Sequence, residues 1–402
     1  MPRPSPTWAR EVLEDQESAL FEDVLPFWMR HALDEEQGGY LHYLRQDGSV
    51  YESDKGLWVQ GRFAWLLCSL VHEYPQHPDA LAWRRAAESG VRFLERHGPA
   101  GEGRYWFQVT RAGQPLRLRR YCYSEAFAAI AYAAWWRLSG EEAAADRSLG
   151  LLELFRRWVR DPGSVPGCEI PKVQSATRAS RSLGPPMILL ATAQVLRECL
   201  GAAEAEEAAR EAVDGILDGF LCPEREALLE CVGTDGRVLD HIEGRTLNPG
   251  HAMEAAWFLL QEAEHQADRA EELRRAGLDI VDWTWRRGWD PLYGGLLAFT
   301  SLDGGPVAEL TAEWKYWWPQ TEAALACLHA YGASGDASHR ERLEQVLGWA
   351  RAHCHDPQHG EWFGYLSREG QPRTSVKGNL WKGPFHLPRM HLVAARLLRR
   401  WS

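Results

Sequence analysis

Two histidines stand beside helix-start signals in separate parts of the chain. His251 follows the candidate N-cap Asn248, and Glu254 lies one helical turn further along the same face. His386 directly precedes the start Leu387-Pro388-Arg389. The positive end of a helix disfavours an imidazolium, so the ring of His251 is expected to be neutral and able to accept a proton. Either histidine alone could equally be hydrogen-bonded within a helix end, but two at equivalent positions indicate proton transfer between paired bases.

The two starts belong to a series of six at nearly constant spacing. They fall near residues 57, 123, 186, 249, 319 and 388, at intervals of 63 to 70 residues. Four contain proline, which suits the first turn of a helix, and one is read as Tyr123-Ser124-Glu125 with Ser124 as the N-cap. A fixed period of this size predicts stacked copies of one supersecondary unit.

Each period is expected to hold an apolar helix, an amphipathic helix and a short insert. The apolar helices are predicted at 126–138, 187–200, 251–263, 321–331 and 389–401, and amphipathic partners at 141–159 and 203–217. Apolar inner helices alternating with amphipathic outer ones predict an all-α fold, an (α/α)6 barrel or toroid of six helical hairpins. An open solenoid is the competing interpretation, but it needs polar-faced terminal caps, and the final helix, ending Leu397-Leu398, is apolar.

The inserts resemble one another and predict short β-hairpins. Three begin with aspartate and glycine and end in an Asp-Gly or Glu-Gly turn; they run over 34–48, 290–304 and 356–370. Weaker copies occur at 103–113 and 228–236. His355 directly precedes the third insert, which contains His359 and Glu361, but Pro357 and Gly360 favour a hairpin there over the helix of a zinc protease.

In a closed toroid the six inner helices begin around one mouth, where residues distant in sequence meet. Charged side chains near these starts are Arg62, Glu125, Glu322 and Arg389. Charged groups at the ends of apolar helices are rare unless paired, so they either form buried ion pairs or bind a polar, hydroxyl-rich ligand. The 20 tryptophans include candidates for stacking on the C–H groups of a sugar.

Composition narrows the function classes. A formal charge of −11 argues against general binding to nucleic acid or anionic membranes, and no apolar run approaches a membrane span. The start lacks the apolar stretch of a signal peptide, and eight scattered cysteines without a CxxC pair are typical of a reducing compartment. We expect one domain over residues 1–402, a cytoplasmic location, a sugar as the partner, and no metal or cofactor. A homodimer is left open.

Over roughly residues 10 to 400, the chain resembles the N-acylglucosamine 2-epimerase family of sugar epimerases and isomerases. The matching stretches are Trp58-x-Gln-Gly-Arg62, Tyr123-Ser-Glu125-Ala-Phe127, Asn248-Pro-Gly-His251-x-x-Glu254, Lys315-x-Trp317-Trp-Pro-x-x-Glu322 and Trp381-Lys-Gly-x-Phe-His386-x-Pro-Arg389. The resemblance implies an (α/α)6 barrel whose catalytic residues are His251 and His386. The substrate-binding positions predicted with it are Arg62, Glu254, Trp318, Gln320, Glu322, Trp381 and Arg389. Some epimerases of the family respond to nucleotides, but no residue here places such a site.

One position departs from the family pattern. Gln320 stands where similar members usually have histidine, and an amide can hydrogen-bond a hydroxyl but cannot titrate. We expect Gln320 to face the mouth and to influence which sugar is preferred.

The chemistry implied is an isomerase reaction of carbohydrate metabolism: inversion of C2 in a free reducing sugar, such as an N-acylglucosamine, an N-acylmannosamine or a related aldose. One histidine removes the C2 proton, an enediolate forms, and the other histidine returns a proton to the opposite face. Three alternatives remain open: an aldose–ketose isomerase such as a mannose isomerase, a non-catalytic glycan-binding toroid, and a glycoside hydrolase or lyase using a carboxylate pair.

Overall fold

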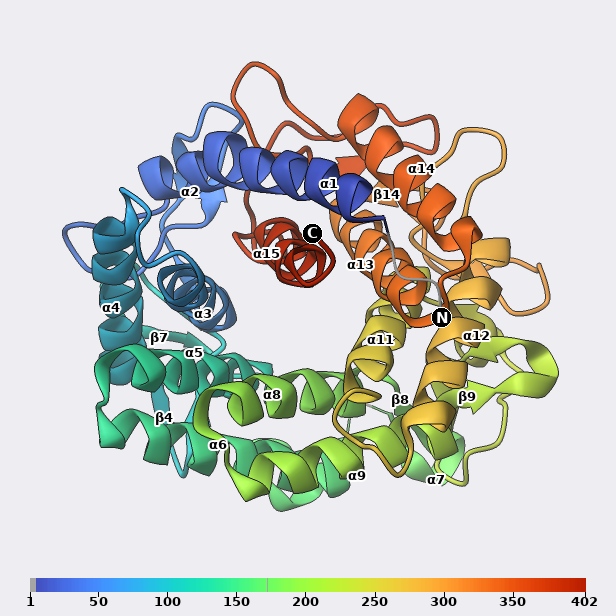
Figure 1. Ribbon diagram of the computed structural model, residues 1–402. Helices are drawn as coiled ribbons and strands as arrows, with labels where there is room; N and C mark the ends of the chain where they lie inside the picture. The colour runs from blue at the N-terminus through green and yellow to red at the C-terminus, as the bar shows by residue number, and fades with distance from the viewer. Residues whose placement is uncertain (1–4, 172) are drawn as a thin grey trace.

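The computed structural model describes residues 5–171 and 173–402. Within these ranges the helices form two concentric rings around one axis (Figure 1). The six inner helices are α3 (Leu57–Glu73), α5 (Tyr123–Ser139), α8 (Gly184–Leu200), α11 (Pro249–Glu262), α13 (Trp317–Ser334) and α15 (His386–Arg399). The outer ring consists of α1 (Pro6–Ser18), α4 (Ala80–His97), α6 (Glu142–Arg160), α9 (Ala203–Phe220), α12 (Ala270–Gly288) and α14 (Ala337–His353). The predicted (α/α)6 toroid is confirmed.

The two rings follow from two kinds of helical sequence. In α3 every residue from Leu57 to Leu70 is buried, as expected for a helix enclosed on most sides. The outer helix α4 instead buries one stripe, including Trp83, Ala87, Val91 and Leu94, at the three- and four-residue spacing of a helical face. Among the helices of the described ranges, none combines the length and apolar character needed to cross a membrane.

The ring closes because the two ends of the chain pack together. Helix α1 continues through a π-helical turn (Ala19–Val24) into α2 (Leu25–His31) and packs beside α15. Gln16 Oε1 lies 2.8 Å from His391 Nδ1, and Glu17 pairs with Arg399 at 2.8 Å. The N-terminal helix therefore supplies the outer partner that the last inner helix lacks. The open-solenoid alternative is wrong.

The predicted helix starts lie within two residues of the observed ones. Proline stands in the first turn of α11 and within the first three residues of α13 and α15. One cap was misassigned: Cys122 is the N-cap of α5, and Ser124 is a buried residue of its first turn. At the other end, Gly140 ends α5 with φ of 72°, a left-handed conformation that glycine adopts without strain.

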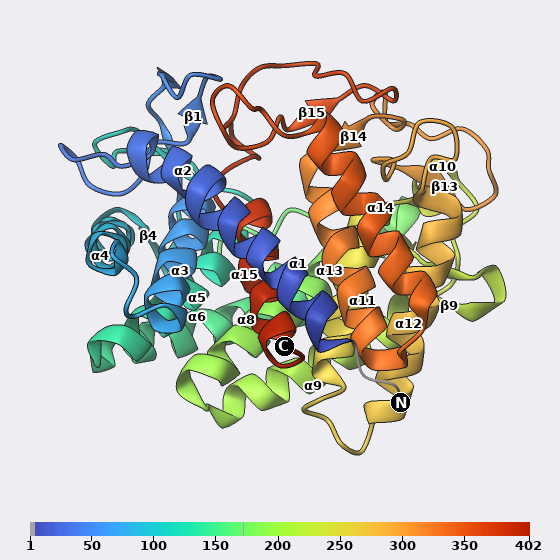
Figure 2. The ribbon, with the colours of Figure 1, turned by 45° about the horizontal axis from the view of Figure 1, so that its top comes forward.

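The strands are two or three residues long and lie at the mouth where the inner helices begin. Figure 2 shows β14 and β15 at the end of the ring away from the C-terminus. The strands are β1 (Tyr43–Leu44), β2 (Val50–Glu52), β3 (Lys55–Gly56), β4 (Pro99–Gly101), β5 (Arg104–Tyr105), β6 (Gln108–Val109), β7 (Pro115–Arg117), β8 (Ser180–Ser182), β9 (Leu221–Cys222), β10 (Ala227–Leu228), β11 (Cys231–Gly233), β12 (Thr246–Leu247), β13 (Thr300–Ser301), β14 (Lys315–Tyr316) and β15 (Tyr365–Leu366). Short helical turns complete the loops: Pro162–Ser164, α7 (Ser175–Arg178), Pro223–Arg225 and α10 (Ile242–Arg245).

Pairing of these strands corrects part of the hairpin prediction. Around Asp47-Gly48 the insert is a hairpin, β1 with β2. The inserts that end near Gly236, Gly304 and Gly370 instead pair with neighbouring repeats, as β11–β8, β13–β12 and β15–β14. Strands this short form few hydrogen bonds in a hairpin alone, and pairing with a neighbouring repeat adds more. Together the paired inserts form a collar around the mouth.

Three inserts are fastened by the same buried ion pair. In each, the aspartate that opens the insert binds a later lysine. The pairs are Lys55–Asp34 at 2.8 Å, Lys315–Asp290 at 3.0 Å and Lys377–Asp356 at 2.9 Å. Each lysine also donates to a glycine carbonyl of its insert. These contacts hold the collar, and with it the starts of the inner helices, at fixed positions.

Candidate active site

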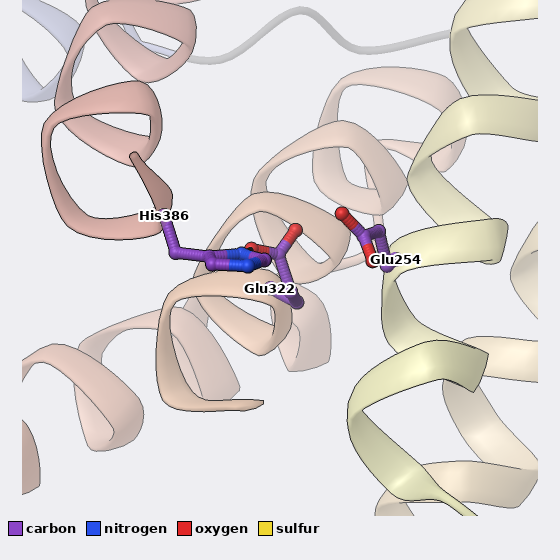
Figure 3. Close-up of side chains that lie close together, drawn as sticks. All are labelled: Glu254, Glu322 and His386. Atoms are coloured by element: carbon purple, nitrogen blue, oxygen red, sulfur yellow. Dashed lines mark hydrogen bonds and ion pairs between the residues drawn. The ribbon is translucent and has the colours of Figure 1, made fainter. Parts of the chain in front are cut away.

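Side chains from the starts of α3, α11, α13 and α15 converge inside the mouth. Figure 3 shows Glu254, Glu322 and His386 reaching toward one another from α11, α13 and α15. Helix α11 begins as predicted, because Asn248 Oδ1 accepts a hydrogen bond from the backbone N–H of His251 at 3.1 Å. The repeat therefore brings together residues that are more than 130 positions apart in the sequence.

His386 is held by a buried carboxylate. Its Nδ1 lies 2.9 Å from Glu322 Oε1 and 3.3 Å from Arg389 Nη2. The shorter contact places the proton on Nδ1, donated to Glu322, which leaves Nε2 as the acceptor. Burial, together with the positive charge of Arg389, holds the pKa of His386 well below its usual range. His386 is therefore a neutral imidazole at physiological pH.

His251 differs from His386 in its electrostatic surroundings. Its Nδ1 lies 2.9 Å from Glu230 Oε2, and both side chains are about a quarter exposed, at 29% and 24%. Burial alone would lower the pKa of His251, but the carboxylates of Glu230, Glu254 and Glu322, with Glu230 foremost, together raise it. The surroundings of His251 therefore favour its protonated form, opposite to the influence expected from the helix dipole.

Sequence reasoning missed Glu230. It lies between β10 and β11, in the weakest copy of the insert pattern. The available signal was a single acidic residue in the apolar run Leu228-Leu229-Glu230-Cys231. The spacing of the helix starts does not predict Glu230, because this residue lies on an insert and not on an inner helix.

Arg389 bridges two carboxylates at the centre of the cluster. It lies 2.6 Å from Glu254 and 2.7 Å from Glu322, and all three side chains are at most 6% exposed. Glu322 also accepts from the indole N–H of Trp257 at 2.9 Å. Glu254 is held by Arg389. Of the two interpretations of these charges, the buried ion pair is observed, and substrate contact stays a prediction.

Arg62 is stacked between aromatic rings. Its guanidinium carbon lies 4.4 Å from the ring centre of Trp58, 4.0 Å from Phe127 and 4.6 Å from Phe385. Within the described residues its Nε has no hydrogen-bond partner. Burial and the nearby charge of Arg389 lower the pKa of Arg62 to about 9, so it is still a cation at neutral pH. It is a buried donor with unused capacity beside the carboxylate cluster.

The side chains of this site that could bind a metal are engaged with one another and with Arg389. Ligand atoms of Glu254, Glu322 and His386 lie within 4.8 Å of one another. The guanidinium of Arg389 already bonds both carboxylates, however, and the histidine nitrogen nearest to them carries a proton toward Glu322. The segment 355–361 is a turn, as predicted, and its Glu361 pairs with Lys382 at 2.8 Å.

Trp318 lies between the two histidines. Its ring centre is 5.3 Å from that of His251 and 5.7 Å from that of His386. A Cβ at Gly250 would meet the Trp318 ring at 2.4 Å, so only glycine lets the indole approach the start of α11 so closely. Trp381 is 49% exposed and packs edge-on against Trp58. Stacking of a sugar on either ring stays a prediction.

A cavity lies beside the cluster of arginines and carboxylates. It is bounded by α3, α5, α8, α11 and α15, and neither His251 nor His386 is among the residues that line it. Arg62, Glu254 and Arg389 contribute polar atoms to its wall, which is otherwise mainly apolar.

Gln320 does not face the mouth, and this corrects the prediction that it binds substrate. It is fully buried, its Oε1 accepts from the backbone N–H of Leu296 at 2.8 Å, and its Nε2 donates to the carbonyls of Leu296 and Tyr316. Gln60, also two residues after a tryptophan at a helix start, binds Tyr40 in the same way. Both amides join an insert to an inner helix.

Replacing Gln320 by histidine is therefore expected to cost stability and leave sugar preference unchanged. An imidazole cannot match all three backbone bonds, and a buried backbone group left unpaired costs about 1–3 kcal/mol. Urea unfolding measures the loss, and Gln60→His, in the matching position, should lose a similar amount. A changed ratio of kcat/KM between two sugars at unchanged stability would contradict this assignment.

Comparison with known proteins agrees with the geometry. The sequence model for N-acylglucosamine 2-epimerase (GlcNAc 2-epimerase) matches residues 39–386. The N-acylglucosamine 2-epimerase of Bos taurus is 35% identical over 96% of this chain and 91% of its own length, and that of Homo sapiens is 36% identical over 93% and 87%. The solved structure of cellobiose 2-epimerase from Bacillus thermoamylovorans B4167 covers 97% of this chain and 100% of its own, with a TM-score of 0.84 at 19% identity. The chain belongs to the N-acylglucosamine 2-epimerase family.

Proposed function

We propose that the protein inverts C2 of a free reducing sugar by proton transfer between two histidines. The observation that carries the proposal is the pair of imidazoles, His251 and His386, each bonded through Nδ1 to its own carboxylate at the start of an inner helix. The names of its relatives, N-acylglucosamine 2-epimerase and cellobiose 2-epimerase, support the same reaction type.

The chemistry requires two bases of opposite protonation. The C2 proton becomes acidic in the ring-opened aldehyde, whose carbonyl takes up the negative charge as an enediolate. Inversion then needs removal from one face and return on the other, so one base must be free while the other is protonated. The low pKa of His386 and the raised pKa of His251 favour this state. In the reverse direction the roles exchange.

The enediolate oxygen needs fixed donors, and the two buried arginines can supply them. Arg62 and Arg389 are both buried, and the Nε atom of each is without a partner in the described part of the chain. Donors held in place before the reaction stabilise developing charge without reorganising. Removal and return of a proton leave the oxidation state of the sugar unchanged, so the balance of the reaction calls for no redox cofactor.

An aldose–ketose isomerase is the second candidate, because return of the proton to C1 gives a ketose from the same enediolate. One base suffices for that reaction, whereas this site carries two imidazoles with separate carboxylates. A glycan-binding toroid would have no use for the opposite pKa shifts of the two histidines.

Location and assembly belong to the same proposal. Within the described residues no two cysteines form a disulfide, which supports a cytoplasmic protein. The clustered side chains all come from one chain, so catalysis does not need a second copy, and sizing of the purified protein tests the homodimer.

Incubation with sugars in D2O tests the reaction directly. N-acetylglucosamine, N-acetylmannosamine, glucose, mannose and cellobiose are followed separately by NMR. We expect a C2 epimer of at least one sugar, carrying deuterium at C2. A ketose product would establish the isomerase instead, and the absence of exchange with every sugar would favour the binding protein.

A further inference from the structure

Glu230 is the one carboxylate at the site that comes from an insert and not from a helix. The Nδ1–H of His251 donates to its Oε2 at 2.9 Å. We infer that Glu230 is a positioning residue for proton transfer at His251, fixing the tautomer of the ring and favouring its protonated form. The inference rests on the function proposed above and adds a residue to it.

The ring of His251 is held from three directions. Asn248 fixes its backbone N–H, Trp318 packs against the ring, and Glu230 holds Nδ1. With Nδ1 committed to a carboxylate, Nε2 is the nitrogen left to exchange protons with a substrate. Without Glu230 both tautomers would be populated, and part of the protein would present the wrong nitrogen.

The backbone of Glu230 is itself anchored. Its carbonyl accepts from the N–H of Leu183 at 3.0 Å, just before α8, and the next residue, Cys231, pairs with Ser182 on β8. On the other side, the N–H of Leu229 donates to Phe220 at 2.9 Å. The carboxylate therefore stands on a segment tied to two elements, as a residue that orients another must.

Glu230 also differs from Glu322 in how its charge is used. Glu322 is fully buried and shared among His386, Arg389 and Trp257. The ion pair formed by Glu230 in the described structure is with His251. Its negative charge is therefore directed mainly to the imidazole, and protonation of His251 gains from it.

Other charged groups also face His251. Glu254 lies on its own helix, Glu322 on α13 and His386 on α15. The two glutamates are already paired with Arg389, so Glu230 is the larger influence on the protonation of His251. Because it acts through His251, its removal should change the pH dependence and not only the rate.

The test separates charge from hydrogen bonding. In Glu230→Gln the amide oxygen can still accept from Nδ1–H but carries no charge, whereas Glu230→Ala removes both. Glu224→Gln is the matched control, since Glu224 is an exposed carboxylate on the turn Pro223–Arg225, just before the insert that carries Glu230. NMR of 15N-labelled histidine reads the tautomer and titration of His251 directly, with the signal assigned by its loss in His251→Gln.

We expect Glu230→Gln to lower the pKa of His251 by about one unit or more, as for loss of an adjacent opposite charge. In the direction in which His251 donates a proton, kcat/KM falls at alkaline pH where His251 loses that proton. Because the pKa of His251 is lower in Glu230→Gln, this fall should occur at lower pH. In the reverse direction His251 is the base, so the acid limit also moves to lower pH. In Glu230→Ala we expect the same fall in the pKa of His251 and, in addition, a mixture of its two neutral tautomers. In Glu224→Gln the titration and the tautomer of His251 should match those of the wild type.

An unchanged titration and tautomer of His251 in both Glu230 variants would overturn the inference. A loss of rate equal at every pH would do so as well, since it would show a structural role only. If the wild-type protein inverts no sugar, the proposed function fails, while the NMR titration still decides whether Glu230 controls His251.

Discussion

Alanine at His386 or at His251 is expected to lower turnover by at least about 10², the lower end for loss of a general acid or base. In His386→Ala the buried Glu322 keeps its bonds to Arg389 and Trp257, so the inner ring should remain folded. In His251→Ala the N-cap bond from Asn248 goes to a backbone N–H and survives. Both losses should therefore be catalytic.

Initial rates with the sugar identified in the D2O panel measure this effect, and circular dichroism and urea unfolding check the fold. His265→Ala is the matched control, because His265 lies exposed just beyond the other end of α11 and should keep wild-type turnover. Near-normal turnover in both site variants, with folding intact, would remove the histidines from the mechanism.

Arg389→Met should produce the largest loss of stability. The change removes the cation from between Glu254 and Glu322, which lie 2.6 and 2.7 Å from it and are almost completely buried. Breaking a buried ion pair by removing one partner costs about 3–5 kcal/mol, because the remaining charge stays buried without compensation. Urea unfolding at neutral pH measures the change.

Two further variants show whether the loss of stability comes from the buried ion pairs or from any substitution of an arginine in or at the end of α15. Arg400→Met removes an exposed arginine at the end of the same helix, whose pair with Glu264 should contribute about 0–1 kcal/mol. Adding Glu254→Gln to Arg389→Met should recover part of the loss, since one uncompensated charge disappears. A cost for Arg389→Met no greater than for Arg400→Met would show that the triad does not stabilise the ring.

Much of the fold could be predicted from the sequence because the inner helices carry strong local signals. Asn248 and the prolines mark their starts, and apolar runs such as that of α3 require burial on most sides. The closure by α1 was less visible. Helix α1 precedes the first repeat in the sequence, and only its packing against α15 shows that it is the outer helix of the last repeat.

The site was predictable where residues belong to helix starts and unpredictable where inserts supply them. His251, His386, Glu322 and Arg389 meet as the repeat implies. Glu230 enters from an insert that pairs across repeats, and short strands carry little sequence pattern. Gln320 was misplaced because its register on α13 points it at the backbone of Leu296; the same Trp-x-Gln arrangement at Gln60 was the available clue.

The most direct test of the two-histidine account is the loss of the C2 proton from each purified epimer in D2O, in His251→Ala and His386→Ala. Each variant keeps one base, so each should exchange the C2 proton of one epimer only, with the opposite choice in the two variants. If both variants exchange the same epimer, or if either exchanges both at the wild-type rate, the two histidines do not serve opposite faces of the sugar.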